Sequence, residues 1–228
     1  MSTEILGHRK SAKTPKKGSN ETRRIELDNG AVGYFKPFGG EDKGLEWGFG
    51  QDSAQQGIHE AAAWRLASQM GPPWSEIVPP VVIREFDGAP GSFALERPGK
   101  LREQEPWNSP EWREAAFFDC LIGQQDRHPA NYLVSGDRIT LIDHGYCFAR
   151  PGDYKNYSWF MYRRYYGEAS KNVAPSRELT YQEREILHRV VSSPDMLGVR
   201  GLVQDSRSDA LRARAVKMLE TGRILKDF

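Results

Sequence analysis

The sequence predicts an α+β protein of two lobes, a β-rich N-terminal lobe that carries one helix and an α-rich C-terminal lobe. Short strand-like runs between turn residues dominate the first hundred of its 228 residues. Beyond residue 158 the pattern is helical. We expect residues 1–14 to form a basic flexible arm, residues 15–97 the N-terminal lobe and residues 98–228 the C-terminal lobe, a length that suits two small lobes around a cleft.

Composition narrows the class of protein. Hydrophobic residues make up 38% of the chain and charged residues 28%, as in a soluble globular protein. No run of eighteen apolar residues occurs, so we expect no transmembrane segment, and the N-terminus lacks the apolar core of a secretory signal. A net charge of +1 argues against a nucleic-acid partner. Cys120 and Cys147 are too few for a disulfide framework, which favours a cytoplasmic protein.

The N-terminal lobe begins with a basic stretch. Residues 8–24 carry seven basic side chains and one acidic side chain, which fits either a solvated arm or a segment that faces phosphate. Asn29-Gly30 then marks a hairpin turn, because both residues tolerate positive φ. Residues 38–56 are expected to form a glycine-rich loop. The remaining elements expected here are strands at 23–27, 31–36, 78–84 and 91–96, and one helix at about 57–70 that Gly71-Pro72-Pro73 ends.

The C-terminal lobe begins with a capped helix. Ser109-Pro110 supplies a cap residue and a proline for its first turn, and the helix continues to about Gly123. Thr180 and Glu183 form a capping box. The other elements expected are short strands at 132–134 and 139–142 and helices at 159–166, 181–192 and 207–222. The dense aromatic residues of 154–166 fit either the core of this lobe or a substrate surface.

The strongest chemical signal lies between these elements. Phosphoryl transfer requires oxygen ligands for a cation and a group that orients the attacking oxygen. A loop that carries Asp126 and Asn131, followed by a hairpin that ends in Asp143, can bring three such side chains together. Such residues are also common turn formers and caps. However, Asp143 follows an apolar strand, where it has no turn to make, and this favours the functional interpretation.

These residues also carry a family resemblance. Asp126-Arg127-His128-x-x-Asn131 and Ile142-Asp143-x-Gly145 resemble the catalytic and metal-binding loops of phosphatidylinositol 3- and 4-kinases, and more distantly those of HipA-like kinases. The resemblance spans about residues 15–150 and implies a bilobal protein-kinase-like fold that binds ATP and Mg²⁺. His144 stands where the family has phenylalanine.

The resemblance implies roles for residues further upstream. Lys36 is expected to contact the ATP phosphates, with Glu60 of the following helix as its partner. Gly18, Ser19 and Asn20 stand where the family has its phosphate loop, and their backbone N–H groups are expected to cradle phosphate. Residues 93–97 are expected to form the hinge between the lobes. The adenine slot is expected to include Ile83, Leu95, Glu96, Leu133 and Ile142.

The catalytic roles follow from the same comparison. Asn131 and Asp143 are the expected Mg²⁺ ligands, and Asp126 is expected to orient or deprotonate the acceptor hydroxyl. His128 either shares that task or supports the loop. Three other histidines, His8, His59 and His188, are expected to have surface or packing roles.

The sequence therefore predicts a kinase that transfers the γ-phosphate of ATP to a hydroxyl, with a protein or peptide acceptor favoured over a lipid or small molecule. A non-catalytic nucleotide-binding scaffold and an AMP transferase on the same fold are the alternatives.

Overall fold

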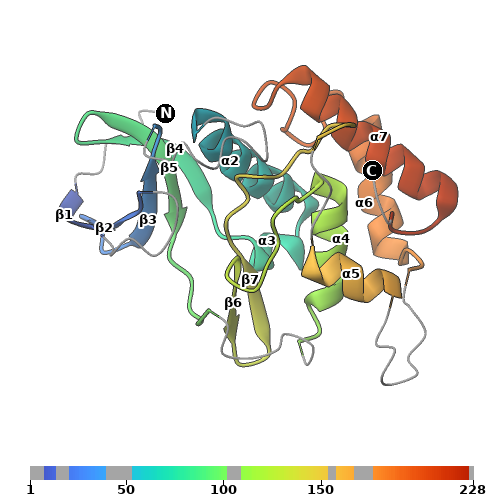
Figure 1. Ribbon diagram of the computed structural model, residues 1–228, viewed down its shortest axis with the longest axis horizontal. Helices are drawn as coiled ribbons and strands as arrows, with labels where there is room; N and C mark the ends of the chain where they lie inside the picture. Colours follow the sequence, from blue (N-terminus) through green and yellow to red (C-terminus); the bar gives the residue numbers. More distant parts are fainter. Residues whose placement is uncertain are drawn as a thin grey trace.

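A sheet of five antiparallel strands in the order β1-β2-β3-β5-β4 forms the N-terminal lobe of the computed structural model (Figure 1). The structure describes residues 8–13, 21–39, 53–101, 109–153, 158–166 and 177–225. The strands are β1 (His8–Lys13), β2 (Arg23–Leu27), β3 (Val32–Pro37), β4 (Val81–Phe86) and β5 (Ala89–Leu95). The predicted hairpin between β2 and β3 is therefore present.

Alternation along β3 positions the residues of interest. Phe35 is fully buried in a small core with Ile25, Leu27, Phe86 and Phe93. Because successive side chains of a strand point to opposite faces, the neighbours of Phe35 on β3 project from the other face of the sheet. That face bears Tyr34 and Lys36, which both line the cavity described below.

Strand β1 corrects part of one expectation. Residues 8–13 belong to the stretch 1–14 that we expected to be a flexible arm, but they pair with β2 in an antiparallel ladder. Their sequence lacks the alternation of a half-buried strand. Within the described residues β1 is an edge strand, where a charged sequence is common and pairing needs no apolar face.

Helix α2 (Ser53–Met70) begins four residues before its expected start at residue 57. Gly57 looks like a boundary in the sequence, but it lies inside the helix. A Cβ at this position would lie 2.3 Å from Cε1 of Phe38, so the glycine permits a close approach of the helix to the chain that follows β3. The helix ends at Met70, directly before Gly71, as predicted.

A short helix, α3 (Trp74–Ile77), occupies the segment after Gly71-Pro72-Pro73 and was not predicted. Strand β4 consequently starts at Val81 rather than at residue 78. Pro79 and Pro80 explain this delay, because proline has no N–H to donate to a strand ladder.

The C-terminal lobe is mainly helical and contains the larger apolar core. Its elements are α4 (Trp112–Ile122), the hairpin of β6 (Tyr132–Ser135) and β7 (Arg138–Leu141), α5 (Trp159–Tyr166), α6 (Tyr181–Ser192) and α7 (Asp205–Thr221). The hairpin lies between the sheet and the helices (Figure 1). The helix expected from Ser109 starts later, because Ser109 accepts a hydrogen bond from the Glu111 N–H in a preceding turn.

The bounds of α5 and α6 are those predicted, and the capping box of Thr180 and Glu183 is present. In α5, Phe160 and Met161 are buried in the core whereas Trp159 and Tyr162 are exposed. None of the described helices is long and apolar enough to cross a membrane. The predicted α+β architecture, a β-rich N-terminal lobe and a helical C-terminal lobe, is confirmed.

Candidate active site

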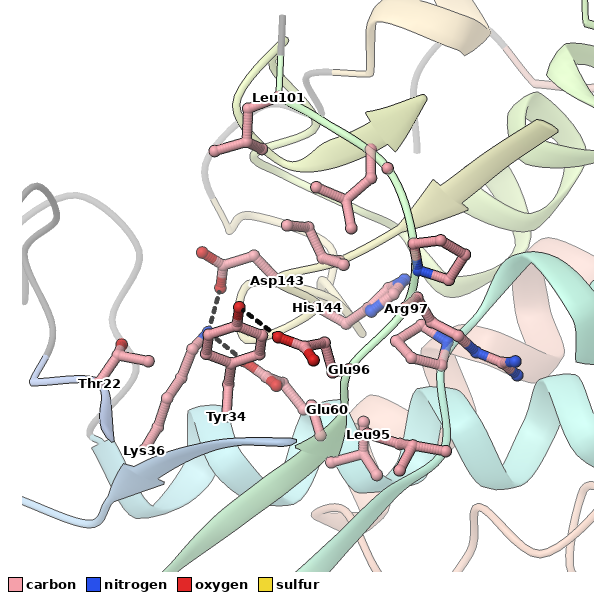
Figure 2. A pocket seen from close by; sticks show the side chains of 17 residues that line it. Thr22, Tyr34, Lys36, Glu60, Leu95, Glu96, Arg97, Leu101, Asp143 and His144 are labelled. Atoms are coloured by element: carbon pink, nitrogen blue, oxygen red, sulfur yellow. Dashed lines mark hydrogen bonds and ion pairs between the residues drawn. The ribbon is translucent and has the colours of Figure 1, made fainter. Parts of the chain in front are cut away.

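A cavity of about 740 Å³ lies where the two lobes meet (Figure 2). The N-terminal lobe contributes side chains from β3, α2, β4 and β5, and the C-terminal lobe contributes β6 and the residues after β7. The residues that line it are Thr22, Tyr34, Lys36, Glu60, Pro79, Val81, Ala94, Leu95, Glu96, Arg97, Pro98, Gly99, Leu101, Leu133, Ile142, Asp143 and His144. Six of the residues singled out from the sequence as binding groups therefore share one cavity with the proposed metal ligand Asp143.

An ion-pair cluster stands at one end of this cavity. Lys36 Nζ lies 2.6 Å from Glu60 Oε1 and 3.0 Å from Asp143 Oδ1. The ion pair expected between Lys36 and Glu60 is thus present, and Lys36 also joins β3 to the segment after β7. Figure 2 shows the lysine between the two carboxylates.

Lys36 and Asp143 stabilise each other's charged forms. Burial would lower the pKa of Lys36, but the carboxylates of Asp143 and Glu60 together raise it above its ordinary value. Burial would raise the pKa of Asp143, but the Lys36 ammonium holds it below its ordinary value. For Glu60 burial has the larger effect and raises the pKa. Lys36 is therefore a fixed cation and Asp143 a fixed anion at neutral pH.

Asp143 adopts a left-handed backbone conformation, with φ of 60°. Aspartate tolerates this region better than most residues, and such strain is often found at functional sites. Gln124 fixes the peptide that follows, because its Nε2 donates to the Asp143 carbonyl at 3.3 Å. Gly145 does not have a positive φ. A Cβ there would lie 3.1 Å from Gln56 Cβ, so close contact with α2 favours glycine.

Asp126 and Asn131 face each other across the loop that precedes β6. Asn131 Nδ2 donates to the Asp126 carbonyl at 2.7 Å and to Asp126 Oδ2 at 3.3 Å. The amide nitrogen is therefore used within the loop, and Oδ1 is the atom left to bind a cation. Burial raises the pKa of Asp126, and the neighbouring His128 opposes this shift.

His128 has the geometry of a supporting group. Its Nδ1 accepts the backbone N–H of Ala130 at 3.1 Å, so the proton of the neutral ring resides on Nε2. Nε2 lies 3.6 Å from Asp126 Oδ2. This arrangement favours loop support over direct proton abstraction, because the nitrogen nearest the carboxylate carries a proton.

Arg127 fixes the loop through a buried side chain. Its guanidinium is fully buried and donates to both carboxylate oxygens of Asp119 on α4 at 3.1–3.2 Å. It also donates to the backbone carbonyls of Asn131 and Ile142. Ser158 Oγ completes the set by donating to Asp119 Oδ2 at 2.7 Å. One side chain thus fixes the backbone of the proposed ligand Asn131 and of Ile142, which precedes the other proposed ligand, Asp143.

Two arginines of α7 also form hydrogen bonds with the chain around this loop. Arg214 donates to the carbonyls of Leu121 and Ala149, which precede the loop and follow the Asp143 segment respectively. Arg207 donates to the Phe148 carbonyl and to Asp153. None of these contacts is predicted by the sequence. Both arginines lie on the buried face of α7.

His59, for which the sequence predicts a packing or surface role, links α2 to the Asp143 segment. It is buried, its Nδ1 hydrogen-bonds the Gly145 carbonyl at 3.1 Å, and its ring lies edge-on to Phe148. Because the carbonyl can only accept, Nδ1 carries the proton. This contact holds the helix that bears Glu60 against the segment that bears Asp143.

The buried His59 leads to a prediction about pH. Burial lowers its pKa to about 3, from an ordinary value near 6.5 in the unfolded chain. Between these values the unfolded state binds one more proton, so the free energy of unfolding falls as the pH falls. In His59→Asn the free energy of unfolding should fall less steeply as the pH falls, by up to about 1.4 kcal/mol per pH unit. Urea unfolding at pH 4–6.5 measures this slope. Parallel curves would contradict the assignment.

Most of the residues expected to form the nucleotide slot line the cavity. Leu95, Glu96, Leu133 and Ile142 all line the cavity. Ile83 does not: it is 45% exposed, and Val81, two residues earlier on the same face of β4, lines the cavity in its place. The segment Gly18-Ser19-Asn20, expected to cradle phosphate, lies outside the described residues.

No family model and no curated protein matches the chain. Solved structures do match. The structure is similar to the Golgi casein kinase with Mn/ADP bound (TM-score 0.59, 12% identity, 95% of this chain and 72% of that chain). It is also similar to the Helicobacter pylori proinflammatory kinase CtkA (0.52, 10%, 96% and 93%) and to hydra Fam20 with sugar (0.54, 14%, 91% and 83%).

At 10–14% identity these similarities concern the fold alone, which this chain shares with the Golgi casein kinase, CtkA and hydra Fam20. They do not identify the chain as a relative of phosphatidylinositol 3- and 4-kinases or of HipA-like kinases, so that relation stays a prediction from the sequence.

Proposed function

We propose that the protein is an ATP- and Mg²⁺-dependent phosphotransferase that moves the γ-phosphate of ATP to a hydroxyl group. The observation that carries this proposal is the position of Lys36 Nζ, 2.6 Å from Glu60 and 3.0 Å from Asp143 in the cavity between the lobes. A paired lysine beside an anionic carboxylate suits a site that binds phosphate and a cation side by side.

Each residue then has a task. Lys36 places a compact positive charge on the phosphates nearest the base, and Glu60 holds it there. Asp126 orients the acceptor hydroxyl and accepts its proton, while Asn131 and His128 restrict its carboxylate. Arg127, through the carbonyls of Asn131 and Ile142, keeps the two loops in register.

The donor set fits a hard cation. Asp143 offers a carboxylate and Asn131 an amide oxygen, which are ligands that Mg²⁺ accepts together with phosphate oxygens and water. When bound, the cation neutralises the charge that develops on the transferred phosphate. The described residues contain no cluster of three His, Cys, Asp or Glu side chains that would hold a metal alone. This agrees with a cation that binds together with the nucleotide.

The finer parts of the proposal rest on the sequence. A protein or peptide hydroxyl is the favoured acceptor. The ordered motifs around Asp126 and Asp143 support a distant relation to phosphatidylinositol-kinase-like enzymes. Two buried cysteines, Cys120 and Cys147, both unpaired, support a cytoplasmic location.

The decisive experiment is incubation with γ- and α-labelled ATP, Mg²⁺ and a generic acceptor such as dephosphorylated casein. Transfer of the γ-label alone is the expected result, whether to the acceptor or to the protein itself. Transfer of the α-label would identify an AMP transferase and overturn the proposal. Binding of ATP without transfer of either label to any acceptor tested, including a random serine/threonine peptide library, would favour a non-catalytic scaffold.

A further inference from the structure

Tyr34 occupies a prominent place in the cavity that the proposed chemistry does not use. It lies on the same face of β3 as Lys36, two residues away, so both side chains enter the cavity. Figure 2 shows the ring beside the lysine stem, pointing towards Glu96. The Tyr34 hydroxyl donates to Glu96 Oε1 at 2.9 Å.

Glu96 is itself fixed. Arg24 of β2 donates from Nε to Oε1 and from Nη2 to Oε2, each at 3.0 Å, which is a bidentate pair. Hydrogen bonds from Arg24 hold the pKa of Glu96 below its ordinary value, and burial raises that of Tyr34. The carboxylate therefore stays charged and the phenol stays protonated. The hydrogen-bonded group of Arg24, Tyr34 and Glu96 thus links β2, β3 and the segment that joins the lobes.

The other lobe contributes two apolar side chains to the lining of the cavity. Leu133 of β6 and Ile142, which follows β7, lie there, and the volume of about 740 Å³ is present with the Tyr34 ring in place. This volume lies in the range that accommodates nucleotide-sized ligands. The ring therefore leaves room for a ligand instead of filling the slot.

We propose that Tyr34 is a specificity-determining residue that stacks on the nucleobase, and that the Arg24–Glu96 pair holds its ring in place. This inference rests on the proposed function, because it takes a nucleoside triphosphate as the ligand. Along β3, the face that carries Tyr34 and then Lys36 orders the ligand: the planar base lies against the aromatic ring, and the phosphates lie at the ammonium. A purine overlaps such a ring more fully than a pyrimidine does, so ATP and GTP should bind more tightly than CTP and UTP.

The test is ligand binding, which needs no turnover. Dissociation constants for a non-hydrolysable ATP analogue and for inorganic tripolyphosphate, both with Mg²⁺, are measured by calorimetry for the wild-type protein and for variants. Tyr34→Ala should weaken binding of the ATP analogue by ~10-fold or more, the scale of one lost aromatic–base stack. Binding of tripolyphosphate should stay within about twofold, because it has no base.

Two further variants separate the ring from its tether. Tyr34→Phe keeps the ring and loses the hydroxyl, and Glu96→Gln weakens the tether, so in both variants the affinity for the ATP analogue should lie between those of the wild type and of Tyr34→Ala. Tyr181→Ala, at a 79% exposed tyrosine on α6, is the matched control and should bind both ligands like the wild type. Thermal unfolding of each variant shows whether the fold is retained.

The outcomes distinguish this inference from the proposed function. Equal binding of the ATP analogue by wild type and Tyr34→Ala, or equal losses for both ligands, would overturn the stacking role and leave the phosphotransferase proposal intact. A wild-type protein that binds neither ligand would overturn the proposed function itself. Tighter binding by Tyr34→Ala would mean that the ring obstructs the slot, which also contradicts the inference.

Discussion

Asp143→Ala is expected to reduce phosphotransfer by about 10³-fold or more while leaving the fold intact. Among the described residues, Asp143 and Glu60 are the two acidic side chains that form ion pairs with Lys36. Loss of the Asp143 carboxylate removes the anionic ligand of the proposed cation site, which costs several kcal/mol of transition-state stabilisation. The side chain is 38% exposed, so its removal leaves no buried cavity, and Lys36 keeps Glu60 as a partner.

The measurement is the initial rate of γ-label transfer at saturating ATP, together with a thermal unfolding curve. Asp137→Ala is the matched control, since Asp137 is an exposed aspartate in the turn between β6 and β7. It should retain wild-type turnover. Full activity in a folded Asp143→Ala protein would remove the central residue of the proposed mechanism.

The elements that the sequence predicts best are those specified by neighbouring residues. Helix α6 begins where the capping box of Thr180 and Glu183 places it, because both bonds of the box form within four residues. The same holds for the hairpin at Asn29-Gly30 and for the loop of Asp126 and Asn131. In that loop the two residues are five apart, and the observed hydrogen bonds close it locally.

The contacts that the sequence does not predict join residues far apart in the chain. Arg24 and Glu96 are separated by 72 residues and Tyr34 and Glu96 by 62, so no local pattern links them. Strand β1 depends on pairing with β2 rather than on its own composition. Asp119 did leave a signal, an acidic residue within the apolar run Phe-Phe-Asp-Cys, but its partners Arg127 and Ser158 appear only in the folded chain.

Arg127→Met is expected to lower the free energy of unfolding by about 3–5 kcal/mol, because it leaves the carboxylate of Asp119 buried without its cationic partner. Burial already raises the pKa of Asp119, and Arg127 and Ser158 counter that shift. Urea unfolding at neutral pH measures the loss. Arg164→Met is the matched control: Arg164 is equally buried and pairs with Glu183, but it touches neither proposed loop. Its stability should fall by a similar amount.

Stability alone does not distinguish the roles of Arg127 and Arg164, because both variants should be destabilised by a similar amount. Turnover does distinguish them. Arg127→Lys retains a positive charge for Asp119, but a single ammonium lacks the fork that reaches Asp119 and two carbonyls together. Per folded molecule, Arg127→Lys should therefore lose about 10²-fold in kcat, the scale expected when a reacting group is misplaced by about 1 Å. At temperatures below the onset of its unfolding, Arg164→Met should keep the wild-type kcat. If both variants keep full turnover, Arg127 stabilises the lobe without positioning the loops that carry Asn131 and Asp143.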